Sequence, residues 1–420
     1  MKILVIGGGG REHAIVKKLA ESSVKPQLFC APGKGGISKE ATCVPFKATD
    51  KESAVDFAVK NQIDMVVVAP DDPLSIGMVD ALEAAGIRAF GPVAAAAQIE
   101  SSKVFSKGLM KKYGIPTADY EVFTDSAAAI TYLKRPQQKY PAVIKADGLA
   151  LGKGVIIAPD FAAASEAVHG MLDDGMFGTS GSRVVIEEFM TGPEVTVLAF
   201  TDGKTIRPMV SSQDHKRAFD GDRGPNTGGM GAFSPSLQYT DEIAEICMET
   251  IFKPTIAALT AEGIKYKGVI YFGLMLTPDG PRVVEYNSRF GDPETQCILP
   301  RLDSDLIDIF NAVIEERLES VEIKWKPEAA CCVVLASGGY PVKYETGYEI
   351  MGLSDAEKTG TILYHAGTKR ENARFYSAGG RVLGVTGMGV TLEDAIRKAY
   401  EGASKISWTN FFYRKDIGKK

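Results

Sequence analysis

Cysteine is scarce in this sequence and is not arranged to bind a metal or to build a disulfide framework. Six cysteines occur in 420 residues, none of them in a CxxC or Cys/His ligand spacing, and Cys331 and Cys332 stand side by side in the apolar run ACCVVLA. Zinc sites and small disulfide-rich proteins depend on spaced cysteine pairs. Both classes are therefore excluded, and we expect reduced, buried thiols in a cytoplasmic protein.

Excess basic charge and long hydrophobic runs are also missing. Lys and Arg number 48 against 53 Asp and Glu, which gives a net charge of −5, whereas a nucleic-acid-binding surface requires clustered positive charge. No apolar run approaches the roughly 20 residues that span a bilayer. Glycine interrupts the N-terminal MKILVIGGGG too early for a signal peptide. We expect neither a nucleic acid nor a membrane as a partner.

Glycine, by contrast, is abundant, with 44 residues that often stand in clusters. A chain of this length exceeds what one hydrophobic core usually fills, so several domains are expected. Apolar runs alternate with helical patterns over the first hundred residues, which predicts a doubly wound parallel sheet. Later strands are separated by tight turns, which predicts antiparallel sheets in an α+β arrangement. The expected strands are Lys2–Ile6, Gln27–Cys30, Met65–Ala69, Arg88–Gly91, Tyr120–Phe123, Ala142–Lys145, Val155–Ala158, Val184–Glu188, Glu194–Thr201, Val269–Leu276 and Arg282–Tyr286, with helices at Glu12–Ser22, Ala54–Asn61, Ile76–Ala85, Ser102–Tyr113, Asp241–Glu262 and Leu392–Ser404.

The first glycine cluster, GGGGREHA, follows a strand and opens a helix, the setting of a phosphate-binding turn. The dinucleotide fingerprint needs a third glycine, but its place is taken by Glu12 or His13. The second strand also lacks the acidic residue that binds a nicotinamide ribose. Both departures argue against a dehydrogenase. The backbone amides of Gly9 and Gly10 remain candidates to hold a phosphate or a small polar substrate, and a merely tight turn is the alternative.

The second cluster, KADGLALGKGV, resembles a phosphate-binding P-loop only superficially. Three residues separate Gly148 from Gly152 where four are required, and Lys153 is followed by Gly154 instead of Ser or Thr. The cluster joins two strands, so it predicts a glycine-rich hairpin that folds over nucleotide phosphates. A purely structural turn is the alternative.

Two further segments carry acidic side chains at strand ends. In VVIEEFMTGPEV, the strand end Glu187–Phe189 can present polar groups to an adenine edge, and Glu194 can accept ribose hydroxyls; an ordinary acidic surface strand is the alternative. In RVVEYNSRFGDPETQ, Glu285 and Asn287 are two apart, so both point to one face of a strand. A carboxylate and an amide oxygen suit Mg²⁺. Arg289 follows on the same face and can pair with a carboxylate or phosphate, although a polar strand edge would also show this pattern.

The stretch SSQDHKRAFDGDRGPNTGGMGAFSP, residues 211–235, shows no strand or helix pattern. A run of this length is usually a linker or a functional loop. Its cations, Lys216, Arg217 and Arg223, stand among glycines that allow close backbone approach to phosphate oxygens. We predict a loop that is mobile without ligand and closes over the substrate phosphates.

Taken together, these motifs resemble the ATP-grasp superfamily, and within it the phosphoribosylamine–glycine ligase family of purine biosynthesis. The resemblance runs from GGGGREHA to the terminal RKDIG, and GPNTGGMG and RFGDPETQ are its most specific strings. It implies a biotin-carboxylase-like architecture. The implied domains are a doubly wound N-terminal domain over residues 1–101, an ATP-grasp domain over 102–321 with a small mobile lid at about 119–190, and a C-terminal α+β domain over 322–420; no further fused domain is expected.

The resemblance implies the ligation of glycine to 5-phosphoribosylamine with ATP, through a glycyl phosphate. No side-chain nucleophile is required, which agrees with the lack of a Ser/His or Cys/His set. Carried over place by place, it assigns catalysis to Lys145, Arg217 and Arg289; ATP binding to Lys103, Lys145, Gly148, Lys153, Gly154, Glu187, Glu188, Phe189, Glu194, Arg217 and Asn226; substrate binding to Gly9, Gly10, Asp214, Lys216, Arg289 and Asp292; and Mg²⁺ or Mn²⁺ to Glu285 and Asn287.

One departure from the family pattern is visible. The third strand ends in VVVAPDDPL where the family usually has Gly-Pro-Glu-x-Pro-Leu, so the acidic side chain is shortened to Asp71 or Asp72. If that acid orients the ribosyl amine, the substrate geometry is slightly altered.

Two other readings stay open on the residues alone. Another carboxylate–amine ligase of the superfamily would share the nucleotide chemistry and differ in the substrate loops. A non-catalytic nucleotide-binding regulator would be expected to lose Glu285, Asn287 or Arg289, and all three are present. The sequence leaves both a monomer and a homodimer open.

Overall fold

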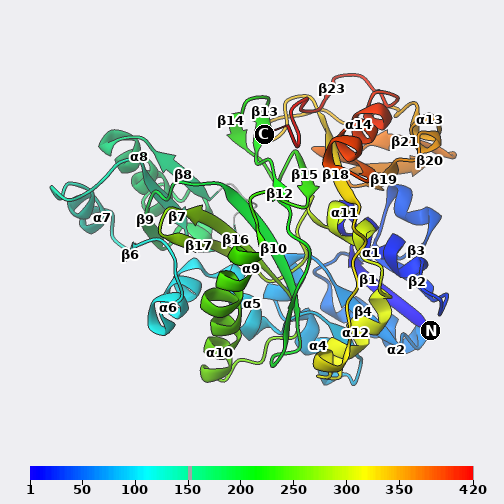
Figure 1. Cartoon of the computed structure of the whole chain (residues 1–420), viewed down its shortest axis with the longest axis horizontal. Helices are drawn as coiled ribbons and strands as arrows, with labels where there is room; N and C mark the ends of the chain where they lie inside the picture. The colour runs from blue at the N-terminus through cyan, green and yellow to red at the C-terminus, as the bar shows by residue number, and fades with distance from the viewer. Residues whose placement is uncertain (150–153, 420) are drawn as a thin grey trace.

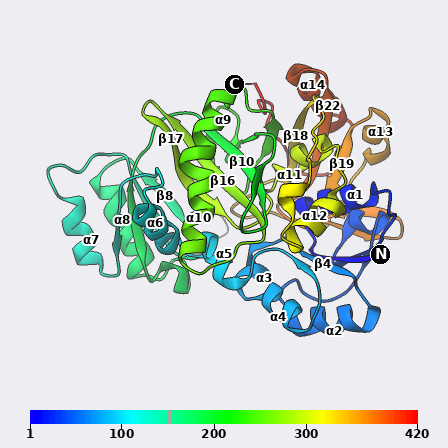
Figure 2. The ribbon, with the colours of Figure 1, turned by 60° about the horizontal axis from the view of Figure 1, so that its bottom comes forward.

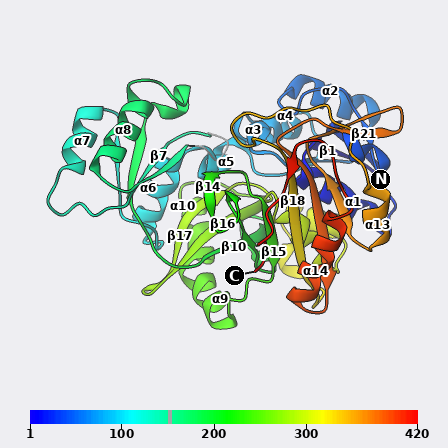
Figure 3. The ribbon, with the colours of Figure 1, turned by 90° about the horizontal axis from the view of Figure 1, so that it is seen from above.

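The computed structural model describes residues 1–149 and 154–419. The antiparallel sheet that carries α7 and α8 lies at one end of the molecule, a second antiparallel sheet lies in the middle, and the N-terminal and C-terminal sheets lie together at the other end (Figure 1). The same order is visible after rotation (Figures 2 and 3). Within the described residues, no helix has the length and apolar character needed to cross a membrane.

The N-terminal sheet is parallel throughout, in the strand order β3-β2-β1-β4-β5. This confirms the predicted doubly wound sheet, in which ligands bind at the carboxyl ends of the strands. The predicted helix Ile76–Ala85 is wrong at its start, because Gly77 adopts φ +82° and separates two shorter helices. The elements are β1 (Lys2–Gly7), α1 (Gly10–Ala20), β2 (Gln27–Pro32), a 3₁₀ turn (Gly35–Lys39), β3 (Thr42–Cys43), α2 (Lys51–Asn61), β4 (Met65–Val68), α3 (Asp71–Ser75), α4 (Met78–Ala84), β5 (Ala89–Phe90) and α5 (Ala94–Ser101).

The central and lid sheets are both antiparallel, as predicted. The central sheet has the order β11-β10-β16-β17 and the lid sheet the order β6-β9-β7-β8. The predicted helix Asp241–Glu262 contains a π-helical segment, Met248–Phe252, between α9 and α10. The elements are α6 (Lys103–Tyr113), β6 (Tyr120–Phe123), α7 (Ser126–Leu133), β7 (Ala142–Ala146), β8 (Val155–Ala158), α8 (Phe161–Leu172), β9 (Val184–Glu188), β10 (Glu194–Thr201), β11 (Ile206–Pro208), α9 (Asp241–Cys247), α10 (Lys253–Ala261), β16 (Gly268–Thr277), β17 (Gly280–Asn287), α11 (Thr295–Ile298) and α12 (Leu306–Ile314).

Residues 211–235 are not irregular, so that prediction was wrong. They form four short strands, of which β15 joins β18 in the C-terminal sheet β12-β15-β18-β22-β19, and β13 and β14 form a separate hairpin. Short glycine-rich strands carry no apolar alternation, and β15 pairs with a strand about a hundred residues away in the chain, so little local signal marks them. The elements are β12 (Gln213–Asp214), β13 (Arg217–Phe219), β14 (Arg223–Asn226), β15 (Gly231–Ser234), β18 (Ala329–Ser337), α13 (Leu353–Lys358), β19 (Ile362–His365), β20 (Thr368–Glu371), β21 (Arg374–Ser377), β22 (Arg381–Gly389), α14 (Leu392–Ala403) and β23 (Phe411–Phe412).

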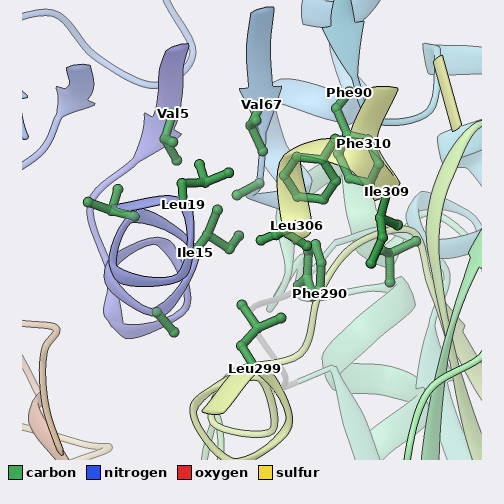
Figure 4. Packing of buried hydrophobic residues seen from close by; sticks show 14 of the residues in the cluster. Val5, Ile15, Leu19, Val67, Phe90, Phe290, Leu299, Leu306, Ile309 and Phe310 are labelled. Atoms are coloured by element: carbon green, nitrogen blue, oxygen red, sulfur yellow. The ribbon is translucent and has the colours of Figure 1, made fainter. Parts of the chain in front are cut away.

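One hydrophobic core joins the N-terminal sheet to the central region. The segment from Phe290 through α12 packs against β1, β4 and α1, and the Phe90 and Phe310 rings stack at 3.8 Å between centroids (Figure 4). Burying large apolar side chains contributes about 1.5–3 kcal/mol each. This shared core fixes the segment after β17, which carries several of the predicted site residues, against the carboxyl edge of the parallel sheet.

Candidate active site

A buried ion-pair cluster lies in the lid sheet beside α6. Lys145 Nζ on β7 is 2.9 Å from Glu187 Oε2 on β9, and Lys107 Nζ on α6 is 3.1 Å from the same oxygen. Each of the three side chains is at most 5 % exposed. The other oxygen, Glu187 Oε1, has no hydrogen-bond partner among the described residues. A buried orphan acceptor favours a ligand that donates a hydrogen bond, such as an amino group.

The same lysine connects the lid sheet to the central sheet. The β16–β17 ladder is irregular between Gly273 and Leu274, which leaves Val284 as the extra residue of a bulge. The freed Val284 carbonyl accepts a hydrogen bond of 3.2 Å from Lys145 Nζ. The bulge therefore aims a backbone oxygen at the lid and ties the two sheets together at the predicted ATP-binding site.

A small apolar cluster lies next to this connection. Met190 follows β9, Met275 lies on β16, and both pack with Ala118 and against Val284. Phe189 beside them is 39 % exposed. The predicted adenine segment thus borders a buried apolar cluster between the two sheets, and apolar side chains suit the faces of a planar base.

Glu188 differs from its neighbours in this segment. Its carboxylate is 2.8 Å from Arg282 Nη1 and accepts a 3.1 Å hydrogen bond from Asp119 N, while its own N–H donates to Asp119 O. These protein contacts occupy both its side chain and its N–H.

Lys103 and the glycine-rich hairpin lie together. Lys103 Nζ donates to Gly148 O at 3.1 Å, and Gly154 O accepts from Ala146 N across the hairpin. Burial lowers the pKa of Lys103, against the raising effect of Glu285. The predicted phosphate ligand Lys153 lies outside the described residues.

Several charged side chains of the site lie around Glu285. Lys216 Nζ lies 3.0 Å from Glu194 Oε2 and 3.8 Å from Glu285 Oε1, and so links the predicted ribose and metal ligands. Burial alone would raise the pKa of Glu285, but four cations outweigh it and hold the pKa below its usual value. The carboxylate is therefore ionised at neutral pH. The cations are Lys103, Lys145, Lys216 and Arg289.

Glu285 and Asn287 fit a magnesium ion that is also bound to phosphate oxygens. They are two apart on β17 beyond the bulge, and an ionised carboxylate and an amide oxygen are hard ligands. No group of three or more His, Cys, Asp or Glu side chains with metal-binding geometry occurs in residues 1–149 and 154–419. Mg²⁺ typically uses one or two protein ligands together with phosphates. The donor set thus fits an ion that arrives with a nucleotide.

Arg289 is held by a buried acid that the sequence analysis missed. Its Nη2 is 2.8 Å from Glu100 Oε1 and donates to Asn287 Oδ1 at 3.2 Å. Glu100 Oε2 accepts hydrogen bonds from the N–H and hydroxyl of Ser288. Burial would lower the pKa of Arg289, but Glu100 and Asp71 outweigh it and raise the pKa. Arg289 Nε lacks a partner within the described part of the chain, so the guanidinium keeps a donor for a ligand.

Asp214 on β12 faces the same group of charges. Burial raises its pKa to about 7, and Lys216 opposes the rise. Such a carboxylate is stabilised in its charged form by any additional cation. Asp214 therefore suits the ammonium group of an amino-acid substrate.

Asp292 lies against the N-terminal glycine turn. A methyl group added at Gly9 or Gly10 would come within 3.6 Å of an Asp292 oxygen. Burial would raise the pKa of Asp292, but Arg381 and Arg11 lower it overall. The structure thus brings the predicted substrate residues of the N-terminal turn and of the GDPETQ motif together.

The amide of Gly9 is already used within this turn. It donates a 2.6 Å hydrogen bond to Glu12 Oε2, while Glu12 Oε1 pairs with Arg11 Nε. In this structure the side chain of Glu12 caps the helix through this amide, so binding of a phosphate or a small polar substrate by Gly9 and Gly10 stays a prediction. Gly9 also lines a cavity of about 480 Å³ at this edge of the N-terminal sheet.

Arg217 and Asn226 pair across the β13–β14 hairpin, with the Arg217 guanidinium donating to Gly224 O at 2.8 Å. The C-terminal segment anchors this hairpin. Arg414, with a fully buried side chain, pairs with Asp222 at 3.0 Å and donates to Arg217 O. Within the described residues, no contact joins the Arg217 side chain to the cluster around Glu285, so its role at the phosphates stays a prediction.

Several residues at the site were not assigned a role from the sequence. Glu100 and Lys107 lie three and four positions from the predicted ATP-binding residue Lys103, on α5 and α6, and Arg381 begins a strand in the C-terminal sheet. Each acts through partners far away in the chain. Glu294, inside the motif GDPETQ, accepts a 3.0 Å hydrogen bond from Tyr271 Oη and could have been found from that motif alone.

Comparison with known proteins gives the family. Models of the N domain, the ATP-grasp (A) domain and the C domain of phosphoribosylglycinamide synthetase match residues 1–100, 101–295 and 330–420. A phosphoribosylamine–glycine ligase of Clostridium acetobutylicum is 47 % identical over 419 residues, covering all of both chains. This chain belongs to the phosphoribosylglycinamide synthetase family.

Solved structures agree with this membership of the family. The crystal structure of phosphoribosylamine–glycine ligase from Thermotoga maritima has a TM-score of 0.85 and 32 % identity, with full coverage of both chains. The biotin carboxylase domain of Hydrogenobacter thermophilus 2-oxoglutarate carboxylase, solved with MgADP, has a TM-score of 0.73 at 14 % identity over 98 % of this chain and 91 % of that one. The second likeness concerns the fold, and it confirms the predicted biotin-carboxylase-like architecture. The domain limits at 101/102 and 321/322 stay predictions.

Proposed function

We propose that this chain ligates glycine to 5-phosphoribosylamine with ATP, through a glycyl phosphate, to give glycinamide ribonucleotide, ADP and phosphate in purine biosynthesis. The full-length family match supports the overall reaction. The convergence of four cations on the ionised carboxylate of Glu285 carries the proposal for the chemistry. Such a cluster of cations suits a reaction in which the triphosphate of ATP and a second anionic substrate must approach each other.

In the first step, a carboxylate oxygen of glycine attacks the γ-phosphorus and the β–γ oxygen bridge breaks, releasing ADP. Both reactants are negative, so the cations of the site lower the barrier by offsetting their repulsion. Lys145 is fixed for this by Glu187 and the Val284 carbonyl. Arg289, held by Glu100, directs its free donor to a carboxylate or phosphoryl oxygen, and Arg217 approaches from the β13–β14 hairpin.

In the second step, the amine of phosphoribosylamine attacks the carbonyl carbon of glycyl phosphate. The C–O bond to phosphate breaks, phosphate leaves with one oxygen from glycine, and the amine loses a proton. No protein nucleophile takes part, so positioning supplies most of the catalysis. Asp214 holds the glycine ammonium, and exclusion of water protects the acyl phosphate from hydrolysis.

Glu285 and Asn287 would hold Mg²⁺ or Mn²⁺, which neutralises charge on the phosphate oxygens when bound. The other residues are assigned to successive parts of ATP: Glu187 and Phe189 to the adenine, Glu194 to the ribose, and Lys103, Gly148, Lys153, Gly154 and Asn226 to the phosphates. Glu188 contributes to ATP binding through its position on β9, between Glu187 and Phe189. The six cysteines are unpaired, as in proteins of a reducing compartment, which supports a cytoplasmic enzyme; we propose a monomer.

The proposal is tested by measuring ADP release with a coupled assay while each substrate is omitted in turn. We expect ADP to form at full rate only when glycine, phosphoribosylamine and ATP are all present, because the acyl phosphate is shielded until the amine arrives. ADP release that is unchanged without glycine, or no ADP release with all three substrates, would contradict the proposed function.

A further inference from the structure

Lys107 on α6 is a buried lysine at the junction of the lid sheet and the central sheet (Figure 1). Its side chain is 2 % exposed, and its Nζ lies 3.1 Å from Glu187 Oε2. The same nitrogen donates a 2.8 Å hydrogen bond to Thr117 Oγ1 and lies 5.8 Å from the ring centroid of Tyr120 on β6. Burying an ammonium group is unfavourable unless it is well paired, and an apolar residue often fills such a position at no loss of stability. The charge of Lys107 therefore points to a use beyond filling space.

The contacts of Lys107 belong to a closed ring that begins and ends on β17. Thr117 Oγ1 donates to Val283 O at 2.7 Å. On the other side, Lys145 Nζ donates to Val284 O, the carbonyl freed by the bulge. The two lysines share one oxygen of Glu187, which closes the ring. In order, its members are Val283, Thr117, Lys107, Glu187, Lys145 and Val284.

This ring holds both ends of the lid sheet against the central sheet. Thr117 lies just before β6, and Glu187 lies on β9, where it pairs in register with Tyr120. Val283 and Val284 directly precede the predicted metal ligand Glu285 on β17. The ring thus fixes the predicted nucleotide residues of the lid relative to the predicted metal ligands.

The charges within the ring do not cancel. Two ammonium groups, of Lys107 and Lys145, share the single carboxylate of Glu187, so one positive charge is in excess. Without Lys107, Glu187 would pair with Lys145 alone and neutralise it. With Lys107 present, the attraction of Glu187 is divided between two cations, and Lys145 keeps the ability to attract an anion. Glu187 also keeps its second oxygen without a partner among the described residues.

We propose that Lys107 is a positioning residue for the nucleotide, which shares Glu187 with Lys145 so that Lys145 keeps its charge for the phosphates and Glu187 keeps one oxygen free for the base. The inference rests on the proposed function, which assigns Lys145 to the phosphates and Glu187 to the adenine. Lys107 acts through these two side chains and through Thr117. Its loss therefore affects the use of ATP more than the stability of the fold, because Lys145 and Glu187 remain paired with each other.

The test compares Lys107→Met with Lys111→Met in the full-length enzyme. Methionine fills a similar volume without the charge. Lys111 is the matched control, because it lies one turn further along α6 and 5.5 Å from the same Tyr120 ring but is exposed. In isothermal titration with ATP and Mg²⁺ without glycine, we expect about tenfold weaker binding in Lys107→Met and wild-type affinity in Lys111→Met.

Kinetics and thermal unfolding separate positioning from a loss of structure. In Lys107→Met, the KM for ATP should rise and kcat should fall, while the KM values for glycine and phosphoribosylamine stay unchanged. The midpoint of thermal unfolding should stay close to that of the wild type. Lys107→Arg keeps the charge and should restore part of the lost ATP affinity.

The pH dependence gives a readout that a purely structural role would not change. Burial lowers the pKa of Lys107 to about 8, although Glu187 opposes this effect. Lys107 is therefore charged below about pH 8 and neutral above it, so kcat/KM for ATP should fall as the pH rises through this value. In Lys107→Arg the guanidinium stays charged, and the fall should move to higher pH. The charged and titratable groups that face Lys107 are Glu187 and Lys145 in the lid sheet, Arg282 on β17, and Tyr120 on β6.

Each result bears on the role of Lys107. Wild-type ATP affinity, KM and pH profile in Lys107→Met would overturn the positioning role even if ligation proceeds. If Lys107→Met fails to fold, the pH profile of Lys107→Arg decides the question, and a decline at the same pH as in the wild type would overturn the role. ATP binding that depends on Lys107 without any ligation of glycine would support the role and refute the proposed function.

Discussion

At the scale of single residues, the site depends on charges that are held by buried partners. Glu285 is ionised because four cations outweigh its burial, and Arg289 keeps its position through Glu100. Removing one partner from such a network leaves the other charge unpaired, which costs more than the contact itself contributes. The effect of each substitution therefore depends on which charged group is left without its partner.

Glu285→Ala and Asn287→Ala should each reduce turnover on the order of 10²-fold, the usual effect of losing one electrostatic contact to a transition state. Because both residues are placed at the metal, raised Mg²⁺ should restore part of the rate. The measurement is ADP release against Mg²⁺ concentration. Asp279→Ala is the control, because Asp279 lies in the exposed turn between β16 and β17. This variant should match the wild type. A wild-type metal dependence in both site variants would contradict the metal assignment.

Residues within motifs were easier to predict from the sequence than the residues that hold them in position. Glu285 and Asn287 stand at alternate positions of β17, and Arg289 follows two residues beyond its end, so the alternation of polar residues is readable from the sequence. Lys107 and Glu100 cannot be found in this way, since their partners, Glu187 and Arg289, are 80 and 189 positions away. The bulge at Val284 was equally hidden, because a register shift depends on the paired strand and not on local sequence.

At the scale of elements, the β13–β14 hairpin depends on the C-terminal segment. Arg414 pairs with Asp222 and Asp416, Asp416 accepts from Gly221 N, and the backbone of Lys415 donates to Asp220. The parallel and antiparallel sheets were predictable from long apolar runs and turn spacing. This hairpin was not, because contacts almost two hundred residues apart in the chain hold it.

Arg414→Ala should destabilise the protein by about 1–3 kcal/mol, since it leaves buried hydrogen-bonding groups without a partner. It should also raise the KM for ATP, because Arg217 and Asn226 lie on the hairpin, and make the hairpin more sensitive to proteolysis. Thermal unfolding and limited proteolysis measure the first and third effects. Lys415→Ala is the matched control, because within the described residues the hydrogen bond of Lys415 to the hairpin comes from its main-chain N–H. Equal stability and KM in the two variants would show that Arg414 does not hold the hairpin in place.

At the scale of the whole molecule, the shared core fixes the N-terminal sheet relative to the central sheet. The segment between them runs from β17 through Arg289 and Asp292 into α12, which packs on the N-terminal sheet (Figure 4). The segment therefore connects the charges around Glu285 to the N-terminal glycine turn, which Asp292 adjoins. Such an arrangement suits an intermediate that forms at the predicted nucleotide residues and reacts with a substrate held near the N-terminal turn.

The most direct test of this account follows an oxygen atom. Glycine labelled with ¹⁸O in its carboxylate is ligated by the enzyme, and the released phosphate is analysed by mass spectrometry. A glycyl phosphate intermediate predicts one labelled oxygen in each phosphate, because the attacking carboxylate oxygen leaves with the phosphoryl group. Product formation with entirely unlabelled phosphate would contradict the account.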